Sequence, residues 1–122
     1  MIKREFSIPM DQILSRIREK IRSLGADIFA EIDHALNAEK VGLKLEPTRV
    51  LIFGNPRIGT LLMQENREIA YELPLRLAIW SSEGKTFVLY ELPSEIGKRF
   101  GITNEEVLKK MDAFMDNVVN VQ

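Results

Sequence analysis

One histidine adjoins a carboxylate in this chain, and this pair is the first place where the residue types could support chemistry. His34 is the single histidine of the 122 residues, and Asp33 precedes it. The unperturbed pKa of histidine lies near neutral pH, so His34 could act as a general base or as a hydrogen-bond donor to a ligand. Neighbouring strand residues point to opposite faces, so Asp33 need not contact His34. The structural alternative makes Asp33 the N-cap of a short helix and places His34 in its first turn.

A second candidate is the segment from Gly54 to Thr60, with the sequence Gly-Asn-Pro-Arg-Ile-Gly-Thr. Asn55 before Pro56 predicts the N-cap and first residue of a helix. Free N–H groups and the positive dipole end of such a helix, with Arg57 and Thr60 as further donors, suit a carboxylate or a phosphate. The segment lacks the lysine and the spacing of a P-loop. The structural alternative is a capped turn whose glycines let the backbone pack closely.

Arg76 is the third candidate, because it interrupts a run of alternating apolar residues. It lies within the sequence Leu73 to Ile79, on the face opposite the leucines. A long cation in this position could bind an anion, pair with Glu72 or Glu91, or extend along the strand to reach water. Asn55, Arg57, Thr60 and Arg76 are therefore the predicted ligand-binding residues.

The composition excludes several classes of function. There is no cysteine, so disulfides, thiolate catalysis and zinc–thiolate sites are excluded, and the one histidine excludes a histidine-rich metal site. Lys and Arg total 17 against 18 Asp and Glu, a balance that argues against a nucleic-acid partner. The longest apolar runs are far below the ~20 residues that span a bilayer, and no targeting segment is visible. We expect a soluble, cytoplasmic protein without a metal, a cofactor or a membrane partner.

Hydrophobic periodicity predicts a mixed α+β domain covering residues 1–122. Strands are expected at 3–8, 26–32, 48–53, 73–80 and 85–92, and helices at 9–24, 34–41, 56–66 and 93–100, with a last helix after a capping box at 103–106. Strand–helix alternation stops after the second strand, which argues against a doubly wound parallel sheet. We predict a single, mostly antiparallel sheet with its two long helices on one face. The other face must meet water, the helical excursions or a second subunit.

Two patterns specify which side chains face the core. Ala26, Ile28, Ala30 and Ile32 alternate with Asp27 and Glu31, which predicts a half-buried strand with the apolar residues on one face. In the last helix, the apolar stripe predicts that Met111, Phe114 and Val118 are buried against the sheet.

The middle of the chain resembles the domain-of-unknown-function 302 family of bacteria and archaea. The resemblance rests on Glu31-Ile32-Asp33-His34-Ala35, Val41-Gly42-Leu43, Pro47-Thr48, Ile52-Phe53-Gly54-Asn55-Pro56, Gly59-Thr60, Met63 and Leu73-Pro74-Leu75-Arg76. Many members have Thr-Pro-Leu-Met where this chain has Leu61-Leu62-Met63, a departure that affects loop geometry and no charged group. The resemblance implies a β-α-β(4)-α fold, like half of the TATA-binding-protein fold, and dimeric members. It implies no activity.

Three functional hypotheses follow. The first is a homodimer that binds a small anionic molecule near Asp33, His34 and the Asn55 helix N-terminus. The second is an enzyme with His34 as acid–base and the helix N-terminus as an anion or oxyanion site, and the third is a ligand-free structural or protein-interaction dimer. The first two hypotheses require the Asp33–His34 motif and the Asn55 motif to lie close together. Parallel strands would bring both motifs to the same edge of the sheet, whereas antiparallel strands would place them at opposite edges.

Overall fold

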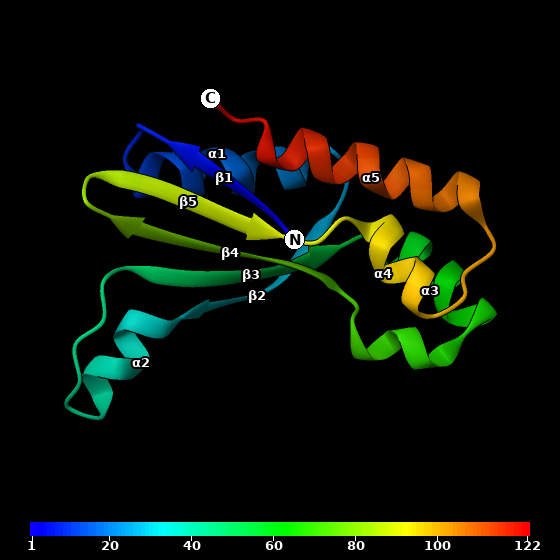
Figure 1. The fold of residues 1–122 in the computed structure, drawn as a ribbon, viewed down its shortest axis with the longest axis horizontal. Coiled ribbons are helices and arrows are strands. Elements are labelled where there is room, and N and C mark those ends of the chain that lie inside the picture. Colours follow the sequence, from blue (N-terminus) through cyan, green and yellow to red (C-terminus); the bar gives the residue numbers. More distant parts are fainter.

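Five strands form one antiparallel sheet in this computed structural model, which describes all of residues 1–122. The strands are β1 (Ile2–Phe6), β2 (Asp27–Asp33), β3 (Thr48–Gly54), β4 (Leu75–Ser82) and β5 (Lys85–Tyr90). Their order across the sheet is β1-β5-β4-β3-β2, so the first strand pairs with the last one (Figure 1). The predicted α+β fold with one antiparallel sheet is therefore confirmed. The strand and helix order is compatible with half of the TATA-binding-protein fold.

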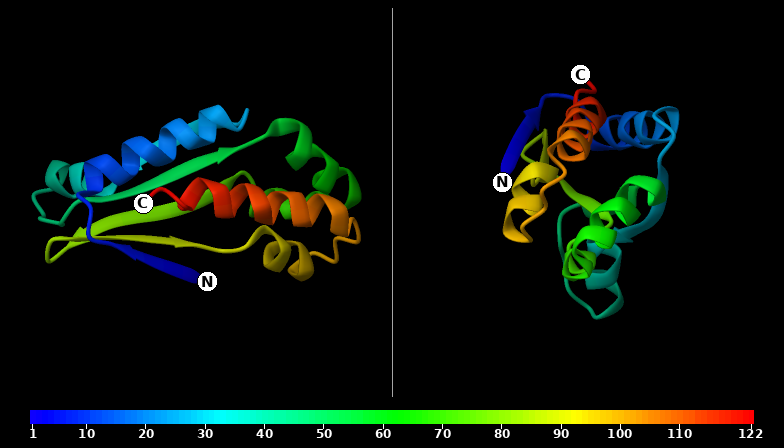
Figure 2. Two further views of the ribbon diagram at one scale, coloured as in Figure 1. Left: turned by 90° about the horizontal axis from the view of Figure 1, so that it is seen from above. Right: turned by 90° about the vertical axis from the view of Figure 1, so that its right-hand side faces the viewer.

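Two long helices, α1 (Met10–Ser23) and α5 (Glu105–Val119), lie on the same side of this sheet (Figure 2). Shorter helices occupy the connections: α2 (His34–Lys40), α3 (Pro56–Glu65), the 3-10 helix η1 (Arg67–Tyr71) and α4 (Pro93–Arg99). The helix α2 extends away from the body of the molecule at one end of the sheet, whereas α3 and α4 lie at the other end (Figure 1).

The core lies between the sheet and the two long helices. Alternate strand residues are buried on that side, among them Leu51, Phe53, Leu77, Ile79 and Val88, and the apolar stripes of α1 and α5 pack against them. Met111 and Val118 are buried as predicted, but Phe114 is only half-buried. Phe114 stands over Phe53, with 6.0 Å between the ring centroids, at the end of the core nearest α3. The prediction that Phe114 is fully buried is therefore wrong.

The opposite face of the sheet carries no long helix and remains largely apolar. The register places Val50, Ile52, Ala78, Trp80, Phe87 and Leu89 there, and each is half-buried. We call this surface the open sheet face. Trp80 and Phe87 stack on it with 5.5 Å between their ring centroids. Tyr90, by contrast, is on the helix side and buried, with its hydroxyl accepting a hydrogen bond from Arg4 Nε.

A β-bulge in β2 changes the facing that the sequence predicts for this strand. Ile28 pairs with Phe53 and Ala30 with Ile52, so Phe29 is an extra residue without a partner on β3. Because of this extra residue, the side chains after Phe29 point to the face opposite to the one that the sequence alternation predicts. Glu31 therefore lies opposite the buried Leu51 and faces the helices. The prediction of one apolar face along this strand is wrong beyond Phe29.

Local signals placed most helix ends correctly. The Asp33 carboxylate accepts a hydrogen bond from the Leu36 amide, and the Asn55 side chain accepts one from the Arg57 amide, so both are N-caps. At the last helix the cap is Asn104, which accepts from the Val107 amide. Thr103, the expected cap, is instead held by Glu65 at the end of α3.

Candidate functional site

The antiparallel pairing of β2 with β3 decides where the two predicted motifs lie. Asp33 pairs with Arg49 at one end, whereas Asp27 pairs with Gly54, next to Asn55, at the other. Six residues of strand at about 3.3 Å each separate the ends by about 20 Å. Direct catalytic contacts require about 3 Å. Within one chain the two motifs therefore do not share a pocket. The anion-binding hypothesis and the enzyme hypothesis both join His34 to the Asn55 helix, so both require a second chain.

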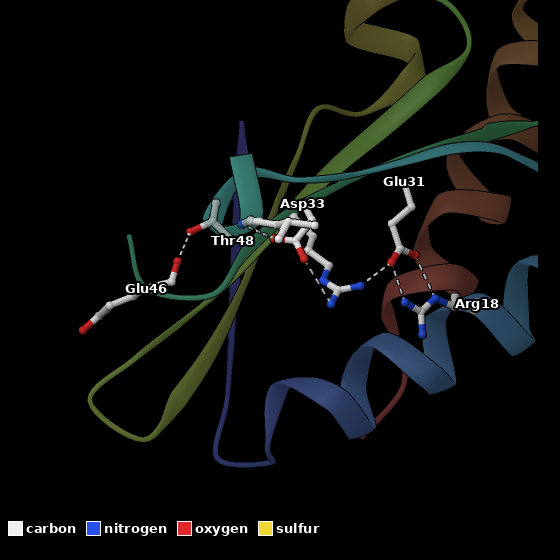
Figure 3. A network of polar contacts seen from close by, with 7 residues as sticks. Arg18, Glu31, Asp33, Glu46 and Thr48 are labelled. Carbon is white, nitrogen blue, oxygen red and sulfur yellow. Dashed lines mark hydrogen bonds and ion pairs between the residues drawn. The ribbon is translucent and has the colours of Figure 1, made fainter. Parts of the chain in front are cut away.

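At the first end, Arg18, Glu31, Asp33 and Arg49 are joined by hydrogen bonds and ion pairs. Figure 3 shows this region, with Arg18, Glu31 and Asp33 labelled. Glu31 accepts two hydrogen bonds from Arg18 of α1, at 2.8 and 2.5 Å, and a third from Arg49 at 2.6 Å. Arg49 also lies 3.4 Å from the Asp33 carboxylate. The two-pronged Arg18–Glu31 contact is the strong geometry for a guanidinium and a carboxylate. We call Arg18, Glu31, Asp33 and Arg49 the charged cluster.

The charged cluster fixes the ionisation of its central carboxylate. Hydrogen bonds from Arg18, with a further contribution from Arg49, hold the pKa of Glu31 below its ordinary value of 4.5, against the opposing effect of partial burial. The hydrogen bonds to Glu31 and its negative charge raise the pKa of Arg18 further above its ordinary value, against the opposing effect of burial. Glu31 is thus an anion at neutral pH with its acceptors engaged by protein donors, which suits a structural tie between α1 and the sheet.

His34 stands beside this cluster but takes no part in it. It begins α2 and is exposed, and none of the hydrogen bonds or ion pairs of the structure includes its ring. Asp33 is engaged by the Leu36 amide and by Arg49, so it does not orient the imidazole. This geometry fits the structural alternative, in which Asp33 is a helix cap and His34 occupies the first turn.

At the second end, the amides of the α3 N-terminus already have acceptors. Pro56 has no N–H, the Arg57 amide donates to Asn55 Oδ1, and the Ile58 and Gly59 amides both donate to the Asn55 carbonyl oxygen at 3.0 Å. The expectation that this terminus offers free backbone donors to an anion is therefore not met by the geometry. The Asn55 amide group Nδ2 remains without a hydrogen-bond partner.

A cavity of about 450 Å³ opens beside this helix terminus. Its walls come from the ends of β3 and β4, from α3 and from one side of α5. Most of the lining is apolar, and includes Leu24, Phe29, Ile58, Met63, Leu73, Pro74, Met111 and Phe114. Polar groups are few: Asn55, Thr60 and Lys110. No carboxylate lines the cavity, and Lys110 is its one ionisable residue.

Of the four predicted ligand-binding residues, the structure places two at this cavity. Asn55 and Thr60 line it, but Arg57 is exposed and outside the lining. Arg76 is exposed on the open sheet face and bonds to Glu72 at 3.0 Å, one of the pairings that the sequence suggested. The predicted set is therefore divided: Asn55 and Thr60 line the cavity of about 450 Å³, Arg57 lies outside it, and Arg76 lines a separate cavity of about 230 Å³.

The residues that sequence reasoning missed come from distant segments. Phe29 reaches the cavity from the β2 bulge, and Met111, Phe114 and Lys110 reach it from α5. The spacing of Glu106 and Lys110 indicates an ion pair on the solvent-exposed side of the helix, and the two side chains do lie 3.6 Å apart. Phe114 belongs to the apolar stripe of α5, so the sequence indicates a core residue, and only the tertiary structure shows that it borders a cavity.

The described chain also lacks two features that would point to other functions. No group of three or more His, Asp and Glu side chains is placed to hold a metal ion. None of its helices combines the length and the apolar character that crossing a membrane requires.

Comparison with known proteins adds long relatives that contain a similar region. Over 103 residues this chain is 35% identical to proteins named fluoride-specific ion channel FluC 1 from Brucella suis biovar 1 and Brucella abortus biovar 1. The match covers 82% of this chain but only 41% and 38% of those proteins. This chain thus corresponds to well under half the length of the relatives it matches.

The fold recurs in a solved structure. The crystal structure of an uncharacterised conserved protein from Bacillus stearothermophilus matches with a TM-score of 0.75, over 97% of this chain and 91% of that one, at 21% identity. That protein is described as a DUF302 protein, and a likeness at this identity speaks for the fold. The family model for the domain of unknown function DUF302 matches residues 2–118. Because this match spans nearly the whole chain, as the motifs around Asp33 and Asn55 led us to expect, the chain belongs to the DUF302 family.

Proposed function

We propose that this chain is a small-molecule-binding domain whose cavity beside Asn55 takes a largely apolar organic ligand. The observation that carries the proposal is the cavity itself. Its volume of about 450 Å³ falls in the usual range of ligand pockets, roughly 300–1,000 Å³. Such pockets combine apolar walls with a few polar groups that orient the ligand. Here Phe29, Met63 and Phe114 are among the walls, and Asn55 and Thr60 are among the polar groups.

The long relatives support a binding role over a catalytic one. In proteins named as fluoride-specific channels, a region like this chain is joined to a longer sequence. A domain that reports a bound molecule to an attached protein would suit that arrangement. The cavity of this chain is a poor site for fluoride itself, because a small hydrated anion gains nothing from apolar walls. The ligand we propose is therefore organic, and the cytoplasmic location expected from the sequence stays a prediction.

The first experiment measures binding of the neutral fluorescent probe N-phenyl-1-naphthylamine. The wild-type chain should bind one probe per chain with a saturable rise in emission. Gly59→Leu should abolish the rise, because the new side chain would project from α3 into the cavity. Gly59 has no positive φ, and a Cβ there would meet Met63 and Leu73 only at 3.9 and 4.0 Å, so the fold should tolerate the change.

Two further variants keep this experiment decisive. Gln64→Leu adds the same side chain to an exposed position of α3 outside the cavity and should leave probe binding unchanged. Ala70→Leu fills the cavity from η1 and should repeat the effect of Gly59→Leu if the latter misfolds. A wild-type chain that gives no saturable signal, or one whose signal survives both cavity-filling changes, would leave the ligand-free hypothesis in place.

We also propose that the chain forms a homodimer through the open sheet face. The support is its apolar surface: Val50, Ile52, Ala78, Trp80, Phe87 and Leu89 form one contiguous patch that no helix covers. Contiguous apolar patches of this kind mark interaction surfaces, and most homo-oligomers are twofold dimers. The half-buried Trp80 is of a side-chain type that dominates interface energetics.

Sedimentation at micromolar concentration tests the dimer. The wild-type chain should sediment at about twice the monomer mass of 14.0 kDa. Ala78→Glu should return it to the monomer mass, since Ala78 is central on the open sheet face, where a monomer can hydrate the new carboxylate. Ala113→Glu, at an exposed position of α5, is the matched control and should stay dimeric. A wild-type monomer at these concentrations would contradict this part of the proposal.

A further inference from the structure

We infer that the ligand of the cavity is an amphiphilic acid, with an apolar chain or ring in the cavity and a single negative group held at its mouth by Lys110. The inference rests on the small-molecule function proposed above and adds the chemical class of the ligand. The sequence suggested the N-terminus of α3 as the group that attracts an anion, but its amides already have acceptors. In the present inference Lys110 of α5 takes this role.

The distribution of charge around the cavity carries the inference. Lys110 is the one charged residue among those that line it, and no Asp or Glu lines it. A carboxylate at the mouth would thus meet an ammonium group and no competing anion in the wall. A cationic group would meet the like charge of Lys110 and no carboxylate in the wall. The wall composition therefore discriminates between charge types as well as between polar and apolar molecules.

Lys110 is also free to change partners. Its present partner is Glu106, one turn earlier on α5, at 3.6 Å, and the two side chains are 70% and 83% exposed. Exposed pairs of this kind contribute little stability, so an incoming anion competes with a weak interaction. The methylene stem of Lys110 adds to the apolar wall while the ammonium stays at the water boundary, which is how lysine behaves beside apolar surfaces.

The neighbouring polar groups can complete the contact with a carboxylate. Asn55 lines the cavity; its Oδ1 caps α3, and its Nδ2 donates to no other group of the chain. The Thr60 side chain also lines the cavity and takes part in no side-chain hydrogen bond of the structure. An amide N–H and a hydroxyl are both donors, as a carboxylate requires. These donors and Lys110 distinguish the site from a purely apolar void.

The experiment compares two probes of equal chain length, decanoate and decanol, as competitors of N-phenyl-1-naphthylamine at pH 8 and below the micelle concentration. The wild-type chain should prefer decanoate by about tenfold or more, and the preference should shrink as salt is added, because exposed charges are screened. Lys110→Met keeps the stem and removes the charge, so decanoate should fall to the level of decanol while decanol is unchanged. Lys109→Met removes a neighbouring exposed lysine outside the cavity and should leave the preference intact.

The outcomes separate the two proposals. If both competitors displace the probe equally and Lys110→Met changes nothing, the cavity is a binding site but the inference about its charge preference is overturned. If Lys109→Met reduces the preference as much as Lys110→Met, the effect is general surface charge and the inference is likewise overturned. If the probe itself does not bind the wild-type chain, the proposed function fails first.

Discussion

The two ends of the β2–β3 pair differ in how far their functional groups are already engaged. At the α2 end, the charged cluster of Arg18, Glu31, Asp33 and Arg49 uses its donors and acceptors on one another. At the α3 end, apolar walls enclose a cavity of about 450 Å³ that the chain does not fill. The charged side chains of the α2 end, which are types common in catalytic sites, therefore connect α1 to the sheet. The α3 end, where the cavity lining is mostly apolar, is the one at which we propose that a ligand binds.

The largest expected effect concerns the two phenylalanines at the α3 end. Phe53 is fully buried beneath Phe114, so Phe53→Ala should lower the free energy of unfolding by about 3–5 kcal/mol. Phe114 is half-buried and lines the cavity, so Phe114→Ala should cost distinctly less, while it weakens binding of N-phenyl-1-naphthylamine. Urea unfolding and probe titration of both variants provide the measurement. Equal losses of stability would mean that Phe114 belongs to the core and that the cavity is smaller than described.

At the α2 end, the corresponding test is Glu31→Ala. The change leaves Arg18 and Arg49 without their shared carboxylate, and hydrogen bonds to charged groups contribute about 1.5–3 kcal/mol. We expect a loss of about 2 kcal/mol in the free energy of unfolding, with probe binding unchanged. Glu19→Ala on the exposed side of α1 is the control, and it should have almost no effect. A Glu31→Ala variant as stable as the wild type would show that the charged cluster does not tie α1 to the sheet.

The pH dependence of stability gives a smaller and more specific effect. The folded pKa of Glu31 lies below its ordinary value of 4.5, so its ion pairs stabilise the fold above that pH and are lost as the pH falls through the folded pKa. The stability difference between the wild type and Glu31→Gln should therefore be constant near neutral pH and shrink below about pH 4.5. Urea unfolding at several pH values measures it. A difference that stays constant down to pH 3 would contradict the assignment of this carboxylate as the cluster's titrating group.

The smallest expected effect is that of His34→Ala. His34 is exposed and has no polar partner, so its removal should change the free energy of unfolding by less than about 0.5 kcal/mol. Binding of decanoate should also be unchanged, because the imidazole lies at the opposite end of β2 from the cavity. A tenfold loss of decanoate affinity in this variant would instead support a site shared between two chains.

Local signals in the sequence predicted much of the fold. The apolar stripes of the two long helices, the caps at Asp33 and Asn55 and the hairpin formed by the strands expected at 73–80 and 85–92 each depend on residues a few positions apart. The turn has positive φ at both Glu83 and Gly84, as a two-residue hairpin requires. Such features need no knowledge of the rest of the chain, so periodicity and capping rules identify them.

The candidate site was harder to predict because it depends on contacts between distant segments. The alternation from Ala26 to Ile32 is regular in the sequence, and only pairing with β3 shows that Phe29 is an extra residue, which turns Glu31 toward α1. Lys110 has an ordinary helical partner in Glu106, so nothing local marks it as a cavity residue. The sequence identified Asn55 as a helix cap. As the cap, however, Asn55 accepts the hydrogen bonds of the amides that were expected to bind an anion.

The most direct test of the difference between the two ends is a titration of the isotopically labelled chain with decanoate, followed by amide chemical shifts in NMR spectra. The amide shifts that saturate with decanoate should cluster around the cavity, on Gly59, Leu73, Lys110 and Phe114. Amides of Asp33, His34 and Arg49 should not move. Saturable shifts centred on those three residues, with none around the cavity, would instead place the binding site at the α2 end and overturn the proposed cavity site.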